Sequence, residues 1–372
     1  MRIYLDNNAT TKIAPSVCAA MVAEMAVTPA NPSSLHADGR AAKERLDKAR
    51  TTIAAYFGWG PKELLFTGSA TEALNTLIRG IGGPIVTSEI EHSAVYNTCK
   101  ELEKKKVPVV FLKPDRDGVI PLTALASALT SSTKLLILSA ANGEIGSKAD
   151  LNETAKIVSN YPNLIWVVDG VALLGKEPIK LPSRVDGAVF TAHKAHGPAG
   201  IAVALIRQTL RANLSPLITG GQQESYLRAG TENMVGIAGF AAAIELLGAD
   251  IEKINAHMRT LRDLFESILK KAIPKLIING AGAGRLPNTS NLYLGVDGES
   301  LHILLDQNGL STSLGSACSS GSVAPSRPLI AMGADRTIAK NSLRFSLCRY
   351  TTEREILSAT TTIISCVQKL HH

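Results

Sequence analysis

Short runs of apolar and β-branched residues alternate with helical segments between about residue 63 and residue 206. Such alternation predicts a parallel sheet whose strands are joined by covering helices. Several of the runs are continuously apolar, which is typical of strands that are buried on both faces. The expected strands are 64–67, 85–88, 109–112, 135–139, 165–169, 188–191 and 201–206.

Two apolar stripes have the spacing of one helix face, and we interpret both as packing surfaces without a direct role in function. They are Leu46, Ala49, Ile53 and Phe57 before the sheet, and Ile356, Ala359, Ile363, Val367 and Leu370 near the C-terminus. A long helical stretch from residue 232 to about residue 272, with a break near Gly248, should connect the sheet to a smaller unit.

The pattern therefore predicts an α/β protein with two packed units, which suits a length of 372 residues. Residues 13–250 should form a large domain around a mostly parallel seven-stranded sheet. Residues 1–12 and 251–372 should form a smaller α/β domain.

Composition narrows the class of protein. Hydrophobic residues make up 45% of the chain and charged residues 19%, which argues against disorder. The five cysteines are odd in number and show no CxxC spacing, so we expect neither a disulfide framework nor a metal site, and a reducing compartment fits best. The N-terminal MRIYLDNNATT lacks the features of a signal peptide, and no run approaches the roughly 18 apolar residues of a membrane span. We expect a cytoplasmic protein.

The formal net charge of +7 could suggest a nucleic-acid partner. The basic residues are scattered, however, and the densest run is only 104–106. We interpret that run as a solvated helix end, with acidic or phosphorylated ligands as a lesser possibility. Direct nucleic-acid binding is not expected.

Ligands of an open parallel sheet bind beyond the carboxyl ends of its strands, so the residues that follow each strand are the candidates for a functional site. The motif TGSATEAL begins at the end of the strand 64–67, and its small residues come directly before an expected helix. The backbone N–H groups and the helix dipole could bind a phosphate at Ala70 and Thr71. The alternative is an ordinary helix cap by Ser69 or Thr71, which this motif taken alone favours.

Three further strand ends have side chains that could take part in binding or catalysis. Asp169 follows an apolar strand, where it could pair with a protonated pyridine nitrogen or cap the next turn. Lys194 in AHKAHGPAG could be an imine-forming amine, although an exposed loop lysine is commoner. Thr191 and His193 could donate to a phosphate or bond loop carbonyls. His92 in SEIEHSAV could stack on a flat ring or cap a helix.

Together these motifs resemble the cysteine desulfurases of the NifS/IscS type, within the class V aminotransferase-fold family of pyridoxal 5'-phosphate (PLP) enzymes. The resemblance runs in order over nearly the whole chain, and it implies the PLP fold type I. Its motifs are YLDNNATT from Tyr4, NPSSLHADGR from Asn31, TGSATEAL, EHSAV, DG from Asp169, the HK pair, LRAGTEN from Leu227, GSACSSG from Gly315 and LRFSL from Leu343.

The resemblance implies a role for each matching residue. Lys194 would form a Schiff base with PLP and later transfer a proton, His92 would stack on the ring, and Asp169 would pair with the pyridinium nitrogen. Asn31 and Arg344 would bind the substrate carboxylate. The other implied cofactor-binding positions are Ala70, Thr71, Asn142, Thr191, Ala192, His193 and Thr231, of which Thr231 would reach across a homodimer interface.

Cys318 lies in the Gly- and Ser-rich stretch SLGSACSSGSVAPS, which predicts a mobile loop. Its thiolate would attack the sulfur of L-cysteine and carry it as a persulfide, while the remainder leaves as alanine. A buried structural cysteine is the alternative, which the small polar neighbours disfavour. The other four cysteines, in apolar helical or strand contexts, are expected to be inert; they are Cys18, Cys99, Cys348 and Cys366.

Two positions depart from the family pattern. Gly143 stands where the family has the second Asn of NNEIG, and Ala172 stands where it has the Gln of DATQ. Both family residues contact the ring hydroxyl of PLP, and each lost hydrogen bond is worth about 1 kcal/mol. A reoriented Asn142 or a water molecule could fill the gap. The family's usual arginine near Ser225 is also absent.

The function implied is a cysteine desulfurase that passes sulfur to an Fe–S scaffold or acceptor protein, for Fe–S clusters or thio-cofactors. The alternatives are a related class V enzyme such as a selenocysteine lyase, which would depend less on Cys318, and a catalytically weakened sulfur-transfer scaffold.

Overall fold

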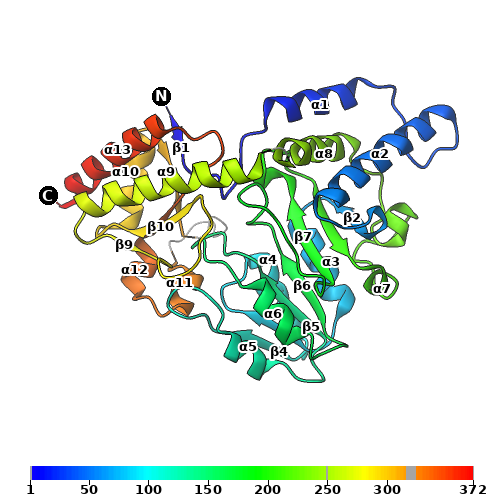
Figure 1. The fold of residues 1–372 in the computed structure, drawn as a ribbon, viewed down its shortest axis with the longest axis horizontal. Helices are drawn as coiled ribbons and strands as arrows, with labels where there is room; N and C mark the ends of the chain where they lie inside the picture. The colour runs from blue at the N-terminus through cyan, green and yellow to red at the C-terminus, as the bar shows by residue number, and fades with distance from the viewer. Residues whose placement is uncertain (1, 249, 316–323, 372) are drawn as a thin grey trace.

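The computed structural model describes residues 2–248, 250–315 and 324–371, and Figure 1 shows their ribbon. Its large sheet has seven strands in the order β2-β8-β7-β6-β5-β3-β4. The strands are β2 (Leu64–Thr67), β3 (Ile85–Ser88), β4 (Val109–Leu112), β5 (Leu135–Ser139), β6 (Ile165–Asp169), β7 (Gly187–Thr191) and β8 (Ala202–Ile206). Five of these bounds agree with the prediction, and β7 and β8 differ by one residue at the start.

The predicted mostly parallel sheet is confirmed, and one strand breaks the pattern. β8 runs antiparallel to both β7 and β2, whereas the remaining pairs are parallel. The chain leaves β7 at Thr191 and returns beside it at Ala202, so these two residues pair across the turn. The loop between them carries Lys194 and begins with the short turn η2 (Ala192–Lys194).

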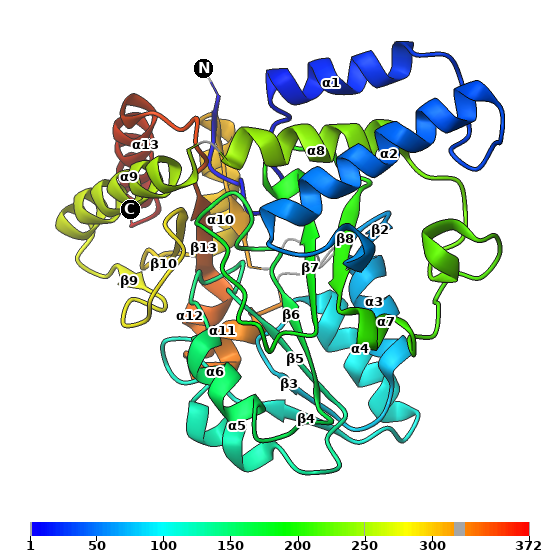
Figure 2. The same cartoon turned by 45° about the vertical axis from the view of Figure 1, so that its right-hand side comes forward.

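Alternate residues of each strand face opposite cores, as the two-residue period of a strand requires. Leu64 and Phe66 of β2 join one apolar cluster, and Leu65 between them joins another. Both faces are therefore covered. The covering helices are α1 (Pro15–Ala26), α2 (Ala37–Tyr56), α3 (Ala70–Ile81), α4 (Ser93–Lys104), α5 (Leu122–Ala128), α6 (Leu151–Val158), α7 (Gln208–Arg211) and α8 (Met234–Gly248). Figure 2 shows α8 lying beside α1 and α2.

A second core is built mainly from the C-terminal part of the chain and includes Leu5 near the N-terminus. One sheet has the order β12-β13-β10-β9, and β1 pairs with β11 in another. The bounds of the elements are β1 (Ile3–Tyr4), α9 (Ile251–Ala272), β9 (Ile277–Ile278), β10 (Thr289–Tyr293), α10 (Gly298–Gln307), β11 (Leu310–Ser311), β12 (Ser313–Leu314), α11 (Arg327–Ala331), α12 (Arg336–Asn341), β13 (Ser342–Ser346) and α13 (Glu353–His371). Two short turns, η1 (Pro61–Glu63) and η3 (Gln223–Tyr226), belong to the rest of the chain. The exact domain boundaries stay a prediction.

Both predicted apolar stripes pack as expected, because their residues on α2 and α13 lie in the two cores, with Leu370 partly buried. The predicted helix break is also confirmed, since α8 ends at Gly248 and α9 begins at Ile251. Within the described ranges, no single helix is long and apolar enough to cross a membrane, while α8 and α9 meet that test only as a pair bent by 77°.

Gly170 follows Asp169 at the end of β6, where the edge of the sheet is tightly packed. A Cβ atom there would lie 2.2 Å from Cε1 of Phe190, a buried ring that stacks on Phe57. We expect Gly170→Ala to lower the free energy of unfolding by about 1–3 kcal/mol, the usual cost of overpacking. Guanidinium denaturation measures this. Gly143→Ala is the control, because its Cβ would meet only Ala172 at 3.8 Å. Equal stability of the two variants would contradict the packing argument.

Candidate active site

A cavity of about 690 Å³ lies at the carboxyl end of the large sheet, where the loops after its strands converge. This volume suits a cofactor together with a small substrate. Segments of the second core complete the wall. Of the predicted site residues, those that line the cavity are Ala70, Thr71, His92, Asn142, Asp169, Thr191, His193, Lys194 and Arg344.

Four predicted residues are not among those lining it. Asn31 is exposed, and its side-chain oxygen accepts a hydrogen bond from the backbone N–H of Ser33 at 2.9 Å. Thr231 is exposed and Ala192 is fully buried, and neither lines the cavity. Cys318 lies outside the described residues. A single chain therefore does not bring Asn31 or Thr231 to the predicted site.

The start of α3 forms the anion-binding end of the cavity. Ser69 caps the helix by accepting the N–H of Glu72 at 3.1 Å, which confirms the capping interpretation. Glu72 in turn accepts the N–H of Gly68 at 2.8 Å and pairs with Arg228 at 3.0 Å. The N–H groups of Ala70 and Thr71 have no acceptor within the helix, so the same turn can also bind an anion.

Thr191 and His193 border the same cavity and already have protein partners. The hydroxyl of Thr191 donates to the carbonyl of Ile201 at 3.1 Å, and Nδ1 of His193 lies 3.2 Å from Oγ1 of Thr10. Burial, followed by the charges of Lys194 and Lys176, lowers the pKa of His193 to about 4. His193 is therefore neutral near pH 7, and its contribution to an anion site is one hydrogen bond without a charge.

Lys194 is held by the N-terminal segment. Its Nζ donates to the carbonyl of Ala9 at 2.9 Å and also to that of Asn8. A second lysine, Lys176, is buried beside it and donates from its Nζ to the carbonyl of Lys194. Burial, and then the nearby charge of Lys194, lower the pKa of Lys176 to about 7. Two amines thus share one wall of the cavity.

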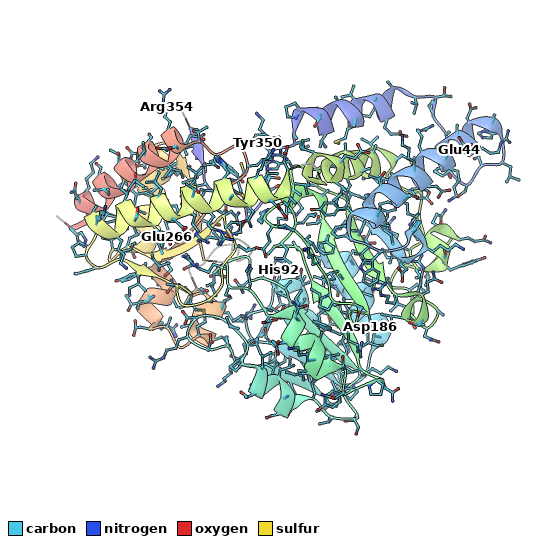
Figure 3. The ribbon with its side chains drawn as sticks, in the orientation of Figure 1. Glu44, His92, Asp186, Glu266, Tyr350 and Arg354 are labelled. Atoms are coloured by element: carbon cyan, nitrogen blue, oxygen red, sulfur yellow. The ribbon has the colours of Figure 1, made fainter. Side chains whose placement is uncertain are left out.

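Asp169 and His92 interact electrostatically with Lys194 and with each other. Asp169 is 4% exposed, and burial raises its pKa although His92 and Lys194 oppose this. Its Oδ1 accepts the N–H of Val171 at 3.0 Å. Burial lowers the pKa of His92, so the neutral imidazole is favoured. Figure 3 places His92 near the centre of the molecule.

The helix-capping role suggested for His92 is confirmed, and stacking on a flat ring stays a prediction. His92 caps α4, because its Nδ1 accepts the N–H of Ala94 at 3.2 Å, and it also lines the cavity. An accepting Nδ1 places the proton of a neutral ring on Nε2. The cap therefore fixes the orientation of the ring at the cavity wall.

The side chains present fit PLP. The N-terminal turn of α3 offers donors for a phosphate, and Asp169 is a buried carboxylate that a pyridinium N–H would stabilise. Lys194 supplies the amine within the same wall, and the cavity is large enough for the ring. A side chain at Gly68 would crowd this turn, because its Cβ would lie 2.9 Å from Oε2 of Glu72.

The two departures from the family pattern are neighbours in space. Both Gly143 and Ala172 line the cavity, and a Cβ on Gly143 would lie 3.8 Å from the Cβ of Ala172. The amide of Asn142 is engaged, since its oxygen accepts the N–H groups of Glu144 and Ile145 and its nitrogen donates to Ile90. Reorienting Asn142 would break these bonds, so water is the more favourable substitute.

Arg344 reaches the cavity from β13. Its Nη2 forms an ion pair with Asp6 at 2.7 Å, and its Nη1 donates to the carbonyl of Gly143 at 3.3 Å. Its Nε is shielded from solvent and has no hydrogen-bond partner among the described residues. One edge of the guanidinium is thus fixed, and the other retains a donor for a ligand.

Four charged residues of the cavity wall were missed in the sequence, namely Glu91, Glu144, Lys176 and Arg327. Glu91 is the first residue of the motif EHSAV and Glu144 lies within NGEIG, so both could have been identified from these motifs. Lys176 and Arg327 follow no such motif. Only the packing of distant segments brings them to this wall.

The other cysteines differ in their surroundings. Cys99 and Cys366 are buried in α4 and α13, and burial raises the pKa of both thiols, that of Cys99 to about 12. Cys18 is exposed on α1. Cys348 lies in the loop after β13, so its expected helix or strand context was wrong. A high thiol pKa disfavours the reactive thiolate at the two buried positions.

Comparison with known proteins gives a consistent family. The model of the aminotransferase class-V family matches residues 3–358. A curated cysteine desulfurase from Nostoc sp. is 40% identical and covers 95% of this chain and 90% of its own length. The cysteine desulfurase IscS of Dictyoglomus turgidum is 36% identical and covers 99% of this chain and 95% of its own.

Solved structures of related proteins have the same fold. A NifS-like protein superposes with a TM-score of 0.93 at 34% identity, and the match covers 100% of both chains. A NifS-like protein from Rickettsia africae has a TM-score of 0.87 at 31% identity, with 100% of this chain and 99% of its own covered. The fold expected from the sequence is therefore confirmed.

The buried carboxyl group of Glu91 should make the free energy of unfolding depend on pH. Burial raises its pKa to about 7, against the hydrogen bonds from Ser139 and Ser88. The folded protein then holds a proton that the unfolded chain releases near pH 4.3. The free energy of unfolding should fall as pH rises from about 5 to 7, by up to about 1.4 kcal/mol per unit from this group.

Glu91→Gln should remove that contribution, so its unfolding free energy should rise relative to the wild type across this range. Guanidinium denaturation at several pH values measures the difference. Glu245→Gln, on an exposed residue of α8, is the matched control. Parallel pH curves for Glu91→Gln and the wild type would rule out the raised pKa.

Proposed function

The chain belongs to the class V aminotransferase family, and we propose that it is a cysteine desulfurase that uses PLP to remove sulfur from L-cysteine. The products are L-alanine and a persulfide on Cys318. The observation that carries this proposal is the grouping of Lys194, His92 and Asp169 at one edge of the sheet. Relatives that carry the name cysteine desulfurase support the choice of reaction.

Each cavity residue has a proposed part in holding the cofactor. Lys194 would bind PLP through its amine, and His92 would pack against the ring. Asp169 would pair with the ring nitrogen, whose protonated form a nearby carboxylate stabilises. The proposed phosphate ligands are Ala70, Thr71, Thr191 and His193, and Ala192 is proposed as a further cofactor-binding position. Asn142 is proposed to support the ring edge, and bound PLP would supply an electron sink for the substrate Cα.

The protein's own residues position the substrate and move its proton. Arg344 would bind the α-carboxylate through its Nε, a donor without a partner in the described part of the chain, while Asp6 occupies its Nη2. Lys194 would accept the proton from Cα, and the carbonyls of Asn8 and Ala9 hold its Nζ near the cavity wall. Neutral His92 would be available as a hydrogen-bond donor through Nε2.

The finer assignments are proposals as well. We assign the protein to the cytoplasm and expect it to act as a homodimer, in which Asn31 and Thr231 would serve the site from a second subunit. Both residues are exposed in the single chain, as such a role requires. The sulfur would pass from Cys318 to an acceptor or Fe–S scaffold protein.

A weakened scaffold is the less favoured alternative, because Lys194, His92, Asp169 and Arg344 all line one cavity. A selenocysteine lyase or related class V activity would use the same residues and is distinguished by its lower need for Cys318. Substitution of Cys318 therefore separates the two enzyme activities.

The decisive assay follows L-alanine and persulfide formation from L-cysteine. Cys318→Ala should lower the rate of alanine release by on the order of 10³-fold or more and abolish persulfide, because the nucleophile is gone. Cys18→Ala is the matched control, since Cys18 is exposed and free. Unchanged alanine release by Cys318→Ala would favour the related lyase, and a wild type that forms no alanine would refute the desulfurase.

Because Gly143 and Ala172 lack side-chain donors, we expect weak binding of PLP, and restoring a donor at either position should strengthen it. Gly143→Asn and Ala172→Gln should each lower the dissociation constant of PLP about fivefold, as one added hydrogen bond would. The two effects should not be independent, because the sites are adjacent. Equilibrium titration of the PLP-free protein measures this, with Gly143→Ala as the control without a donor. Unchanged affinity in both variants would contradict the predicted weak binding, because it would show that a bound water molecule already replaces both contacts.

A further inference from the structure

Arg327 reaches the cavity from the first position of α11, in the C-terminal part of the chain. Its Cζ lies 3.8 Å from the centroid of the Tyr96 ring, and its Nη2 donates to the carbonyl of Glu91. Both partners flank His92 in the sequence. The stacked ring and the carbonyl therefore hold the guanidinium at the wall on which His92 lies.

The other end of this guanidinium retains an unused donor. Nη1 of Arg327 is shielded from solvent and has no hydrogen-bond partner among the described residues. Two more residues of the same cavity show this feature, because Nε of Arg344 and Oε1 of Glu144 are also shielded and have no hydrogen-bond partner in the described ranges. Buried polar atoms are rarely left unpaired in native proteins, so this cluster points to a ligand.

The charges of this cluster do not cancel. Arg344 is paired with Asp6, whereas Arg327 has no carboxylate within 4.0 Å in the part of the chain that the structure describes. Burial raises the pKa of Glu144, while a hydrogen bond with Ser326 and the charges of the two arginines oppose that shift. Of these two arginines, only Arg344 has a carboxylate at ion-pair distance among the described residues, whereas Arg327 interacts with Glu144, Glu91 and Glu89 at longer range.

We propose that Arg327 is a specificity-determining residue that binds a negative charge on the side chain of the amino-acid substrate, while Arg344 binds the α-carboxylate. The inference rests on the proposed function, in which the substrate is L-cysteine and the side-chain anion is its thiolate. A free cysteine thiol has a pKa of about 8.5, so most of it is protonated near neutral pH. A cation at its binding position favours the thiolate.

The proposal has a specific consequence for ligand choice. Amino acids with an anionic group on Cβ should bind more tightly than neutral amino acids of the same shape. L-Aspartate and L-asparagine provide this comparison, because they differ in charge and hardly in size. A purely structural Arg327, which only packs on Tyr96 and bonds Glu91, would affect both ligands alike.

The test measures dissociation constants of both ligands by calorimetric titration of the PLP-loaded protein near neutral pH. The wild type should prefer L-aspartate. Arg327→Gln should bind L-aspartate about tenfold or more weakly, the size expected for one lost hydrogen bond to a charged group, and L-asparagine within about twofold of the wild type. Arg327→Lys, which keeps the charge, should retain part of the preference.

Arg349→Gln is the matched control. Arg349 also lies over a tyrosine ring, that of Tyr350 at 5.6 Å, and donates to a carbonyl, that of Leu246, but it does not line the cavity. It should leave both dissociation constants unchanged.

Three results would overturn the role of Arg327: equal weakening of both ligands by Arg327→Gln, no change for L-aspartate, or a wild type without preference, including one that binds neither ligand. The proposed function is tested apart from this. A wild type that prefers L-aspartate but forms no alanine from L-cysteine refutes only the desulfurase, and one that forms alanine without that preference refutes only the role of Arg327.

Discussion

The buried carboxylate of Asp169 is the constraint on which the rest of the site depends. Burial opposes its charge, and the neighbouring His92 and Lys194 favour that charge. Burial lowers the pKa of His92, the charge of Asp169 opposes this shift, and the charges of Lys194 and Arg327 add to it. An arrangement of this kind is stable only while the three side chains stay close, and the carboxyl edge of the parallel strands keeps them so.

The N-terminal segment connects this cluster to the second core. Residues of β1 pair with β11, and Leu5 packs in the C-terminal core. A few residues later the carbonyls of Asn8 and Ala9 accept hydrogen bonds from Lys194. Asp6 pairs with Arg344 between these two points. One short segment thus positions the amine proposed to hold the cofactor and the guanidinium proposed to bind the substrate.

The cavity wall has few side-chain donors for the ring of a cofactor, but it retains donors for a substrate. At the ring edge, Gly143 and Ala172 offer no side-chain donors, while Asn142 is committed to the backbone. Next to them, Arg344 donates to the carbonyl of Gly143, and Arg327 and Arg344 each keep a shielded donor that has no partner among the described residues. The protein therefore combines sparse support for the cofactor with strong positive charge toward the substrate, and these features act on different quantities, cofactor affinity and substrate choice.

The sequence alone determined the elements and the family. Continuous apolar runs of four or five residues mark buried strands, because such strands need apolar side chains on both faces. Small residues after β2 marked the helix start, and the ordered motifs identified Lys194, His92, Asp169 and Arg344, which all line the cavity. These signals are local, so they can be read without knowing how distant segments meet.

Only the tertiary structure decided what those segments form together. Arg327 and Glu91 are 236 positions apart, and no local pattern predicts that they are bonded. The adjacency of Gly143 and Ala172, the antiparallel direction of β8 and the distance of Asn31 and Thr231 from the cavity of a single chain likewise depend on packing. Burial and charge pairing are properties of assembled surfaces, which residue order alone does not specify.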